Sequence, residues 1–378
     1  MNLLKSFKVI ICAVLICTMF SGCMNSLHLK DLTVVEGMGI DRTEKETLVT
    51  ARTLNVEKTA GSSEASEGNM TVNAEGSGAT IVDAVASVSK NLSKELFFGQ
   101  NKLIIFSKDI AENDFKNKID YFLRSDDSRN DVSVCISNTK AKDILETKEN
   151  ESKVPCENIL HLMKKDEESG SSAYVTTGEL IKFYTDKTSD IYLPVLEKDK
   201  KTQNVKAVGI GIFDEDRLVY TLDEEETMGF LIISGRAENC TLEFEDEKFG
   251  KIGVRISGIK AKNEVQIKDG DIIFSTQIKT GYIISEIQNG IVNSLDAEKL
   301  DEISAMTESK LISLCEKSFK ACQENNSDCM RVGNYLAKYS SEAYNSVSDK
   351  WDDYYKSVKY SVSAQCKLKK ISDNAQFN

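Results

Sequence analysis

The stretch LTVVEGMGIDRTEKETLVTARTLNV, residues 32–56, contains the clearest strand pattern of the chain. Its first part, Leu32 to Ile40, is apolar and rich in β-branched residues, and Leu48 to Val56 alternates apolar with polar side chains. The polar residues Asp41 to Glu46 separate the two runs. Two such runs joined by a polar turn predict a β-hairpin.

Downstream of this hairpin, helical and strand patterns alternate. Apolar residues recur at the spacing of one helix face in some segments and form short continuous runs in others. These segments are helices at 81–92 and 114–123, strands at 102–106 and 132–136, and a mostly helical region at 141–185. No repeat appears.

Two segments interrupt this pattern. Thr59 to Gly78 is rich in Gly, Ser, Glu and Ala, with few apolar anchors, and predicts a flexible loop. Glu197 to Gln203 is charged and has no apolar residue, which predicts an exposed connector at a domain boundary.

The second half of the chain begins with a hairpin and a helix and ends with a long helix before a final strand. The expected strands are 205–213, 218–222, 241–244, 252–259, 265–267, 272–284 and 360–368, and the expected helices are 224–233, 296–325 and 332–339. Asp296 is the expected N-cap of the long amphipathic helix, and the strands from 241 to 284 predict one antiparallel sheet.

We therefore expect an α+β fold with mostly antiparallel sheets and flanking helices, in an ectodomain of about three domains. Residues 23–200 form the N-terminal region, which holds two of them and includes the flexible loop 59–78. Residues 204–372 form the C-terminal domain. This length is ample for sizeable hydrophobic cores.

The N-terminus has the pattern of an export signal. Lys5 and Lys8 precede an uncharged apolar run, Val9 to Phe20, which is followed by Ser21 and Gly22. The run has 12 residues, whereas a helix that crosses a bilayer needs about 20. Residues 1–22 are therefore expected to be a signal peptide that is cleaved after Gly22.

Cys23 follows the small residues directly, in the order Met19-Phe20-Ser21-Gly22-Cys23. This order resembles a bacterial lipobox, in which the cysteine receives a diacylglyceryl group on sulfur and, after cleavage, an acyl group on its nitrogen. Two or more acyl chains anchor a protein stably to a membrane without a spanning helix. The resemblance implies a protein held by lipid on Cys23 at the outer face of a membrane; the alternative is an ordinary secreted protein.

Removing the signal peptide leaves 46 Lys and Arg against 60 Asp and Glu, a formal charge of −14 with His neutral. Such a balance disfavours phosphate backbones and anionic lipid headgroups, and no basic stripe interleaved with aromatic residues is visible in the sequence. Nucleic acid is therefore not an expected partner.

Cysteines at Cys315, Cys322 and Cys329 recur at steps of seven, which return to nearly one helix face. They are either a metal or disulfide cluster or a buried stripe of small hydrophobes. The stripe is the favoured interpretation, because no CxxC pair and no nearby histidine accompany them. The mature chain holds seven further cysteines after Cys23, so at least one has no partner within the chain.

The sequence offers little material for catalysis. Its two histidines, His28 and His161, are far apart, which leaves almost nothing for Ser-His-Asp, Cys-His or histidine-rich zinc chemistry. Paired carboxylates of the kind that hydrolyse glycosides stay open, since separation in space is invisible in a sequence. We expect no catalytic residue, no metal site and no cofactor, and hence no enzyme.

Two glycine pairs and two acidic runs are candidate ligand sites. The pairs Gly37/Gly39 and Gly209/Gly211 sit in apolar strands and lack the third glycine of a dinucleotide fingerprint, so they indicate close backbone packing. The runs at 223–226 and 349–353 lack the alternating ligands of an EF-hand loop and indicate solvated surface.

Several motifs in the same order resemble the Ger(x)C family of spore germination lipoproteins. They are Cys23 followed by Val35-Glu36-Gly37-Met38-Gly39-Ile40-Asp41; Gln100 to Phe106 followed by Tyr121-Phe122-Leu123-Arg124-Ser125-Asp126; Leu193-Pro194-Val195-Leu196; Val208 to Phe213; Glu226-Thr227-Met228-Gly229-Phe230-Leu231; and finally Asp328, Gly333 and Trp351. Met24-Asn25 and the loop at 59–78 depart from the family pattern.

The resemblance implies a non-catalytic C subunit of a nutrient germinant receptor of the GerA type, anchored in the inner membrane of a spore. Its implied partners are two polytopic membrane subunits of the A and B types, with direct nutrient binding left open. Only Cys23 carries over as a functional position. The alternatives are a lipid-anchored solute-binding protein of a transporter and a wall-degrading enzyme.

Overall fold

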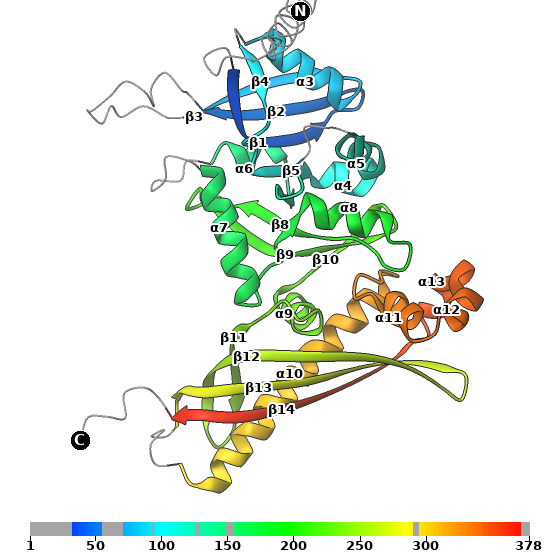
Figure 1. The fold of residues 1–378 in the computed structure, drawn as a ribbon. Helices are drawn as coiled ribbons and strands as arrows, with labels where there is room; N and C mark the ends of the chain where they lie inside the picture. The colour runs from blue at the N-terminus through cyan, green and yellow to red at the C-terminus, as the bar shows by residue number, and fades with distance from the viewer. Residues whose placement is uncertain are drawn as a thin grey trace, which may run out of the picture.

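The computed structural model describes residues 32–54, 71–92, 94–124, 129–147, 155–289 and 295–371. The predicted cleavage at Gly22, the predicted lipidation at Cys23, His28 and residues 59–70 lie outside these ranges. The described chain forms two β-sheets that follow one another along the long direction of the molecule, with helices around and between them (Figure 1).

The first sheet has ten strands and a parallel centre. Its main path runs β10 (Arg217–Leu222), β9 (Val205–Asp214), β8 (Tyr192–Lys198), β6 (Ser133–Ser137), β5 (Leu103–Ser107), β1 (Leu32–Arg42), β2 (Thr47–Leu54) and β3 (Thr71–Gly78), with β4 (Glu95–Phe97) on β1 and β7 (Val175–Thr176) on β6. The pairs β1/β4, β1/β5, β5/β6 and β6/β8 are parallel, and the outer pairs of the main path are antiparallel.

Helices cover both faces of this parallel centre, which explains why β5 and β6 are buried at every position. One face packs on α6 (Ala141–Leu145) and α7 (Pro155–Glu168). The other face packs on α3 (Ile81–Lys90), α4 (Lys108–Asn113), α5 (Phe115–Arg124) and α8 (Thr177–Thr185).

The predicted hairpin at residues 32–56 is confirmed as β1 and β2. The glycines of β1 act as the pattern indicated, because a Cβ on Gly37 would lie 2.6 Å from Cys156 Sγ and one on Gly39 would lie 3.0 Å from Leu145 Cδ1. The absence of side chains at these positions lets α6 and α7 lie directly on the strand.

The flexible loop predicted at 59–78 is wrong for its last part. Residues 71–78 form β3, which pairs antiparallel with β2 along its whole length. Its glycines serve packing, since a Cβ on Gly76 or Gly78 would collide with the backbone of α3. In residues 71–78, glycine therefore reflects close contact of the strand with α3 and not a flexible loop.

The exposed connector predicted from Glu197 to Gln203 is wrong for its first two residues, because Glu197 and Lys198 end β8 and pair antiparallel with β9; the rest of it is the turn between these two strands. The first sheet thus continues through residues 205–222, beyond the boundary drawn at 200–204. The rest of the run of charged residues without apolar side chains corresponds to the solvent-exposed turn of the β8–β9 hairpin. The division into domains at this point stays a prediction.

The second sheet has the order β11 (Asn239–Asp246), β12 (Gly250–Lys268), β13 (Asp271–Ile287) and β14 (Lys359–Ile371). The two strands predicted at 252–259 and 265–267 are one strand, β12, in which a bulge interrupts the register between Ser257 and Lys260. β14 lies parallel to β13, an arrangement that the sequence pattern did not predict.

Helices connect the two sheets. α9 (Glu224–Ile233) is apolar on most sides and buried, and it packs against α10 (Ala297–Glu324) beside the second sheet (Figure 1). The chain then passes through α11 (Val332–Tyr339), α12 (Ser341–Val347), the short 3₁₀ helix η3 (Ser348–Lys350) and α13 (Trp351–Tyr355). The α+β class and the long helix capped by Asp296 are confirmed.

Candidate functional site

Two loops from opposite halves of the chain meet at buried carboxylates. One loop joins α8 to β8, and the other joins α10 to α11. We call this contact the aspartate junction and define it by Asp186, Asp190, Asp328, Arg331 and Trp351.

Asp328 is the centre of the junction and is 2% exposed. Its Oδ1 accepts a hydrogen bond from the backbone N–H of Val332 at 2.7 Å. Its Oδ2 accepts from the N–H of Gly333 at 2.7 Å and from Trp351 Nε1 at 3.0 Å. Gly333 is required here by space, because a Cβ would lie 2.8 Å from the carbonyl oxygen of Thr188.

Asp190 connects the first half of the chain to this loop. Its Oδ2 accepts from the backbone N–H of Asp328 at 2.7 Å, and its own N–H donates to the carbonyl oxygen of Asp328 at 3.3 Å. Its Oδ1 accepts from the N–H of Glu215, in the turn between β9 and β10, at 3.1 Å. One side chain therefore ties three segments together.

Burial shapes the electrostatics of both carboxyls. Removal from water raises the pKa of Asp328 to about 8, even though its N–H donors favour the charged form. Burial likewise raises the pKa of Asp190 to about 7, and the nearby charges of Asp214 and Asp352 act in the same direction. Two aspartates with raised pKa values, Asp190 and Asp328, therefore lie in contact where the two halves of the chain meet.

Asp186 closes the rim of the junction. Its Oδ2 lies 3.0 Å from Arg331 Nη2, and its Oδ1 accepts from the N–H of Thr188 at 3.0 Å. Burial opposes its ionisation, but these donors outweigh burial and lower the pKa of Asp186. Arg331 has a φ of 66°, a left-handed conformation that costs energy for a residue with a side chain.

This geometry indicates a structural role: the aspartate junction connects the first sheet to the loop between α10 and α11. The carboxylate oxygens of Asp190 and Asp328 are already occupied by N–H donors of the protein, so they are not poised to take a substrate proton. Among the described residues, no group of three or more His, Cys, Asp or Glu has an arrangement that could hold a metal ion.

Other predicted positions serve packing and capping. His161 lies exposed on α7. Cys315 and Cys322 are buried on α10, as the stripe interpretation predicted, but Cys329 lies beyond the end of that helix, with its Sγ 3.6 Å from Cys322 Sγ. Burial raises the pKa of the Cys315 thiol, which makes it a poor nucleophile. The acidic run at 223–226 caps α9 and pairs with lysines of α10.

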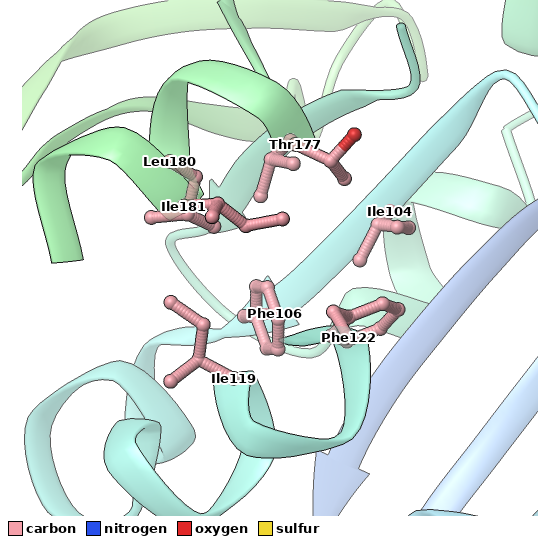
Figure 2. A pocket seen from close by; sticks show the side chains of 8 residues that line it. Ile104, Phe106, Ile119, Phe122, Thr177, Leu180 and Ile181 are labelled. Atoms are coloured by element: carbon pink, nitrogen blue, oxygen red, sulfur yellow. The ribbon is translucent and has the colours of Figure 1, made fainter. Parts of the chain in front are cut away.

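Two cavities were tested as ligand sites. The first lies in the core between β5, α5 and α8, where Figure 2 shows Phe106, Phe122, Ile119 and Leu180 converging, and its interior has no room for a water molecule. It is part of the hydrophobic core.

The second is an open groove of about 830 Å³ between the start of α3 and α5. Its charged side chains are paired with one another: Lys118 Nζ lies 2.9 Å from Asp114 Oδ2, and Arg124 Nε lies 2.8 Å from Asp120 Oδ2. A polar ligand would have to compete with these internal ion pairs.

Part of the aspartate junction is visible in the sequence. Asp328, Gly333 and Trp351 were singled out as one C-terminal motif, and the fold brings them into direct contact. Asp190 was missed, because a lone aspartate before a strand carries no pattern. In the described part of the chain, no helix is both long and apolar enough to cross a membrane.

Comparison with known proteins gives a consistent result. The family described as "Spore germination protein N-terminal domain" matches residues 25–198, and "Spore germination B3/ GerAC like, C-terminal" matches residues 208–372. Spore germination protein B3 of Bacillus subtilis is 22% identical over 350 residues, which cover 90% of this chain and 92% of the relative. Spore germination protein A3 of the same organism is 23% identical over 92% of this chain and 93% of the relative.

A solved structure shares the fold. The crystal structure of the GerBC protein superposes with a TM-score of 0.59 at 16% sequence identity and covers 88% of this chain and 97% of that one. The two matched families together span nearly the whole chain after its first 24 residues. This chain belongs to the Ger(x)C family of spore germination proteins.

Proposed function

We propose that this protein is the lipid-anchored, non-catalytic C subunit of a nutrient germinant receptor in the inner membrane of a spore. The observation that carries the proposal is the match of both family domains, in order, over residues 25–198 and 208–372. The relatives that match over most of their length are named as spore germination proteins. Of the proposal, these names support the role in spore germination.

The anchor is proposed from the sequence of residues 19–23 and from the apolar segment before it. Lipid on Cys23 would confine the protein to a plane and so raise its effective concentration against membrane subunits of the A and B types. Those partners are proposed from the family alone.

The aspartate junction supports a mechanical role. Hydrogen bonds from Asp190 and Asp328 join the first sheet to the α10–α11 loop within a buried contact, so that a force on one half is transmitted to the other. We propose that the ectodomain acts as one stiff body when it contacts its partners.

The test replaces Cys23→Ala in the native spore-former. Cys17→Ala is the matched control, because it removes a cysteine from the same signal segment without touching the lipidation position. We expect Cys23→Ala to leave the membrane fraction and to abolish germination with one set of nutrients, while Cys17→Ala behaves as wild type.

Two outcomes would contradict the proposal. Retention of Cys23→Ala in the membrane fraction would exclude lipid on Cys23 as the anchor. Release of the protein with unchanged germination would exclude the receptor role.

The groove between α3 and α5 favours the alternative of a solute-binding protein. A ligand that binds the folded state raises the melting temperature with concentration. Thermal shift with pooled amino acids, sugars and nucleosides checks this alternative, and we expect no shift, because the charged groups of the groove are internally paired.

A further inference from the structure

The second sheet has one covered face and one open face. On the covered face, Tyr360 stacks on Phe319 of α10 with ring centroids 4.3 Å apart, and Tyr282 OH lies 2.6 Å from Ser304 Oγ. Along β14, residues alternate between this half-buried side and an exposed side. The exposed side faces away from α10.

Basic side chains gather on the open face of β12, β13 and β14. They are Arg255, Lys260, Lys262, Lys279, Lys359, Lys367 and Lys369. We call this set the basic sheet face. The acidic residues of the same side are Glu264, Asp271 and, toward β11 and the sheet's far end, Glu243, Glu245 and Glu286.

The register places like charges together on this face. Lys260 of β12 is the direct cross-strand partner of Lys279 of β13. Like charges directly opposite one another destabilise a sheet. Folding alone therefore gives no reason for this pair, and an anion that binds between the two ammonium groups would relieve the repulsion.

Some of the basic residues have partners, and several do not. Lys262 pairs with Glu264 at 2.5 Å, and Lys359 pairs with Asp271. Within the described ranges, the ion pairs include none that involves Lys260, Lys279 or Lys367. These three ammonium groups are free to meet an external anion.

Lys369 is held flat across the sheet. Its Nζ donates to Ser257 Oγ at 2.9 Å and to the carbonyl oxygen of Ser257 at 3.1 Å. Its methylene stem occupies the space over Gly281, where any Cβ would collide with it. The ammonium group of Lys369 is thus held over β12 and β13.

The charge of strands β12, β13 and β14 is opposite in sign to that of the whole chain. The segments 250–268, 271–287 and 359–369 carry nine Lys or Arg and three Asp or Glu, whereas the whole chain has 48 basic and 60 acidic residues. The net negative charge of the chain therefore conceals a basic surface on these three strands.

We propose that the basic sheet face lies against the anionic headgroups of a phospholipid membrane. The face is rich in lysine and has no exposed aromatic side chain among its described residues. Protein interfaces are depleted in lysine and enriched in aromatic residues, and single-stranded nucleic acid needs aromatic stacking platforms. Lysines on a surface are what attracts a protein to anionic lipid.

The geometry allows this contact together with an N-terminal anchor. In Figure 1 the second sheet is seen from one of its faces, with the first sheet beside it along the long direction. The open face therefore looks to the side of the molecule, so a protein lying along the membrane can present it to lipid. The inference goes beyond the proposed function and does not depend on it.

The test measures sedimentation of the chain from Met24 onward, which keeps every described residue, with vesicles. Vesicles of phosphatidylcholine with phosphatidylglycerol are compared with pure phosphatidylcholine at low and high salt. We expect binding only to the anionic vesicles and loss of binding at high salt. The triple variant Lys260→Gln/Lys279→Gln/Lys367→Gln should bind about 100-fold more weakly, since each lysine near such a surface contributes about fivefold.

The matched control is Lys45→Gln/Lys90→Gln/Lys200→Gln, which removes the same charge from exposed lysines outside the second sheet. It should bind as wild type does. Equal weakening by both triple variants would show a general charge effect and overturn the assignment to this face. Absence of binding by the wild type to anionic vesicles would overturn the proposal itself.

Discussion

Removal of the Asp328 carboxylate should open the contact between the two halves of the chain. Asp328→Ala leaves three buried donors without an acceptor: the N–H groups of Val332 and Gly333 and the indole N–H of Trp351. Each unsatisfied buried donor costs about 1–3 kcal/mol, and relief of the desolvation of the buried carboxyl group offsets part of the sum. We expect a loss of about 3–5 kcal/mol in the free energy of unfolding.

The chain provides its own probe for this measurement. Trp351 is the single tryptophan of the sequence and lies in the junction, so its fluorescence during urea unfolding reports on this contact. A multidomain chain need not unfold in one step, and the fluorescence transition isolates the local event from the rest.

A control variant and a double variant test whether the stability loss comes from the three unpaired donors. Asp353→Ala removes an exposed acid two residues from Trp351 and should change stability by less than about 0.5 kcal/mol. Trp351→Phe, followed by circular dichroism, should cost less in the Asp328→Ala background than in wild type, because the orphaned indole donor is then absent. The reasoning is refuted if Asp328→Ala unfolds at the same urea concentration as Asp353→Ala.

Two further predictions concern pH and packing. Since burial raises the folded-state pKa of Asp190 to about 7, above its ordinary value of 3.8, the stability it contributes is fully present below that ordinary value and is lost as pH rises through 7. The free energy of unfolding of wild type relative to Asp190→Asn should therefore increase as pH is lowered from about 8 to 5, as measured by urea titration, and a difference independent of pH would contradict the shift. Gly229→Ala should lower stability by about 1–3 kcal/mol in the same assay, because its Cβ would collide with the carbonyl oxygen of Leu314 and separate α9 from α10. Gly253→Ala, whose Cβ would meet only Glu286 Cβ at 3.8 Å, is its control, and equal losses in both would refute the packing argument.

Much of the second half of the fold follows from local pattern. The helix at 224–233 and the helix at 332–339 have the bounds that the sequence predicted, and Asp296 caps the long helix before β14. These elements carry strong periodic or capping signals, which depend only on neighbours along the chain. The parallel pairing of β14 with β13 carries no such signal, because it is decided by the path of the chain through the intervening helices.

Glycine was the least reliable indicator of local structure, since it is common both in flexible loops and where two segments pack closely. Gly37 and Gly39 were correctly interpreted as packing positions because they lie within an apolar strand. Gly76 and Gly78 were placed in a flexible loop because polar residues surround them, yet α3 lies against them. Only the position of that helix distinguishes the two cases.

The sequence by itself determined the export signal pattern, the α+β class and the family, because each rests on residues close together or on motifs in a fixed order. Tertiary structure alone decided where the charge lies and which acids meet. Lysines from Lys260 to Lys369 form one face because alternate residues of neighbouring strands point to the same side of a sheet. The contact between Asp190 and Asp328 also depends on tertiary structure. The two residues are 138 positions apart in the sequence, so only the packing of their segments brings them together and buries them, and no local sequence pattern encodes this.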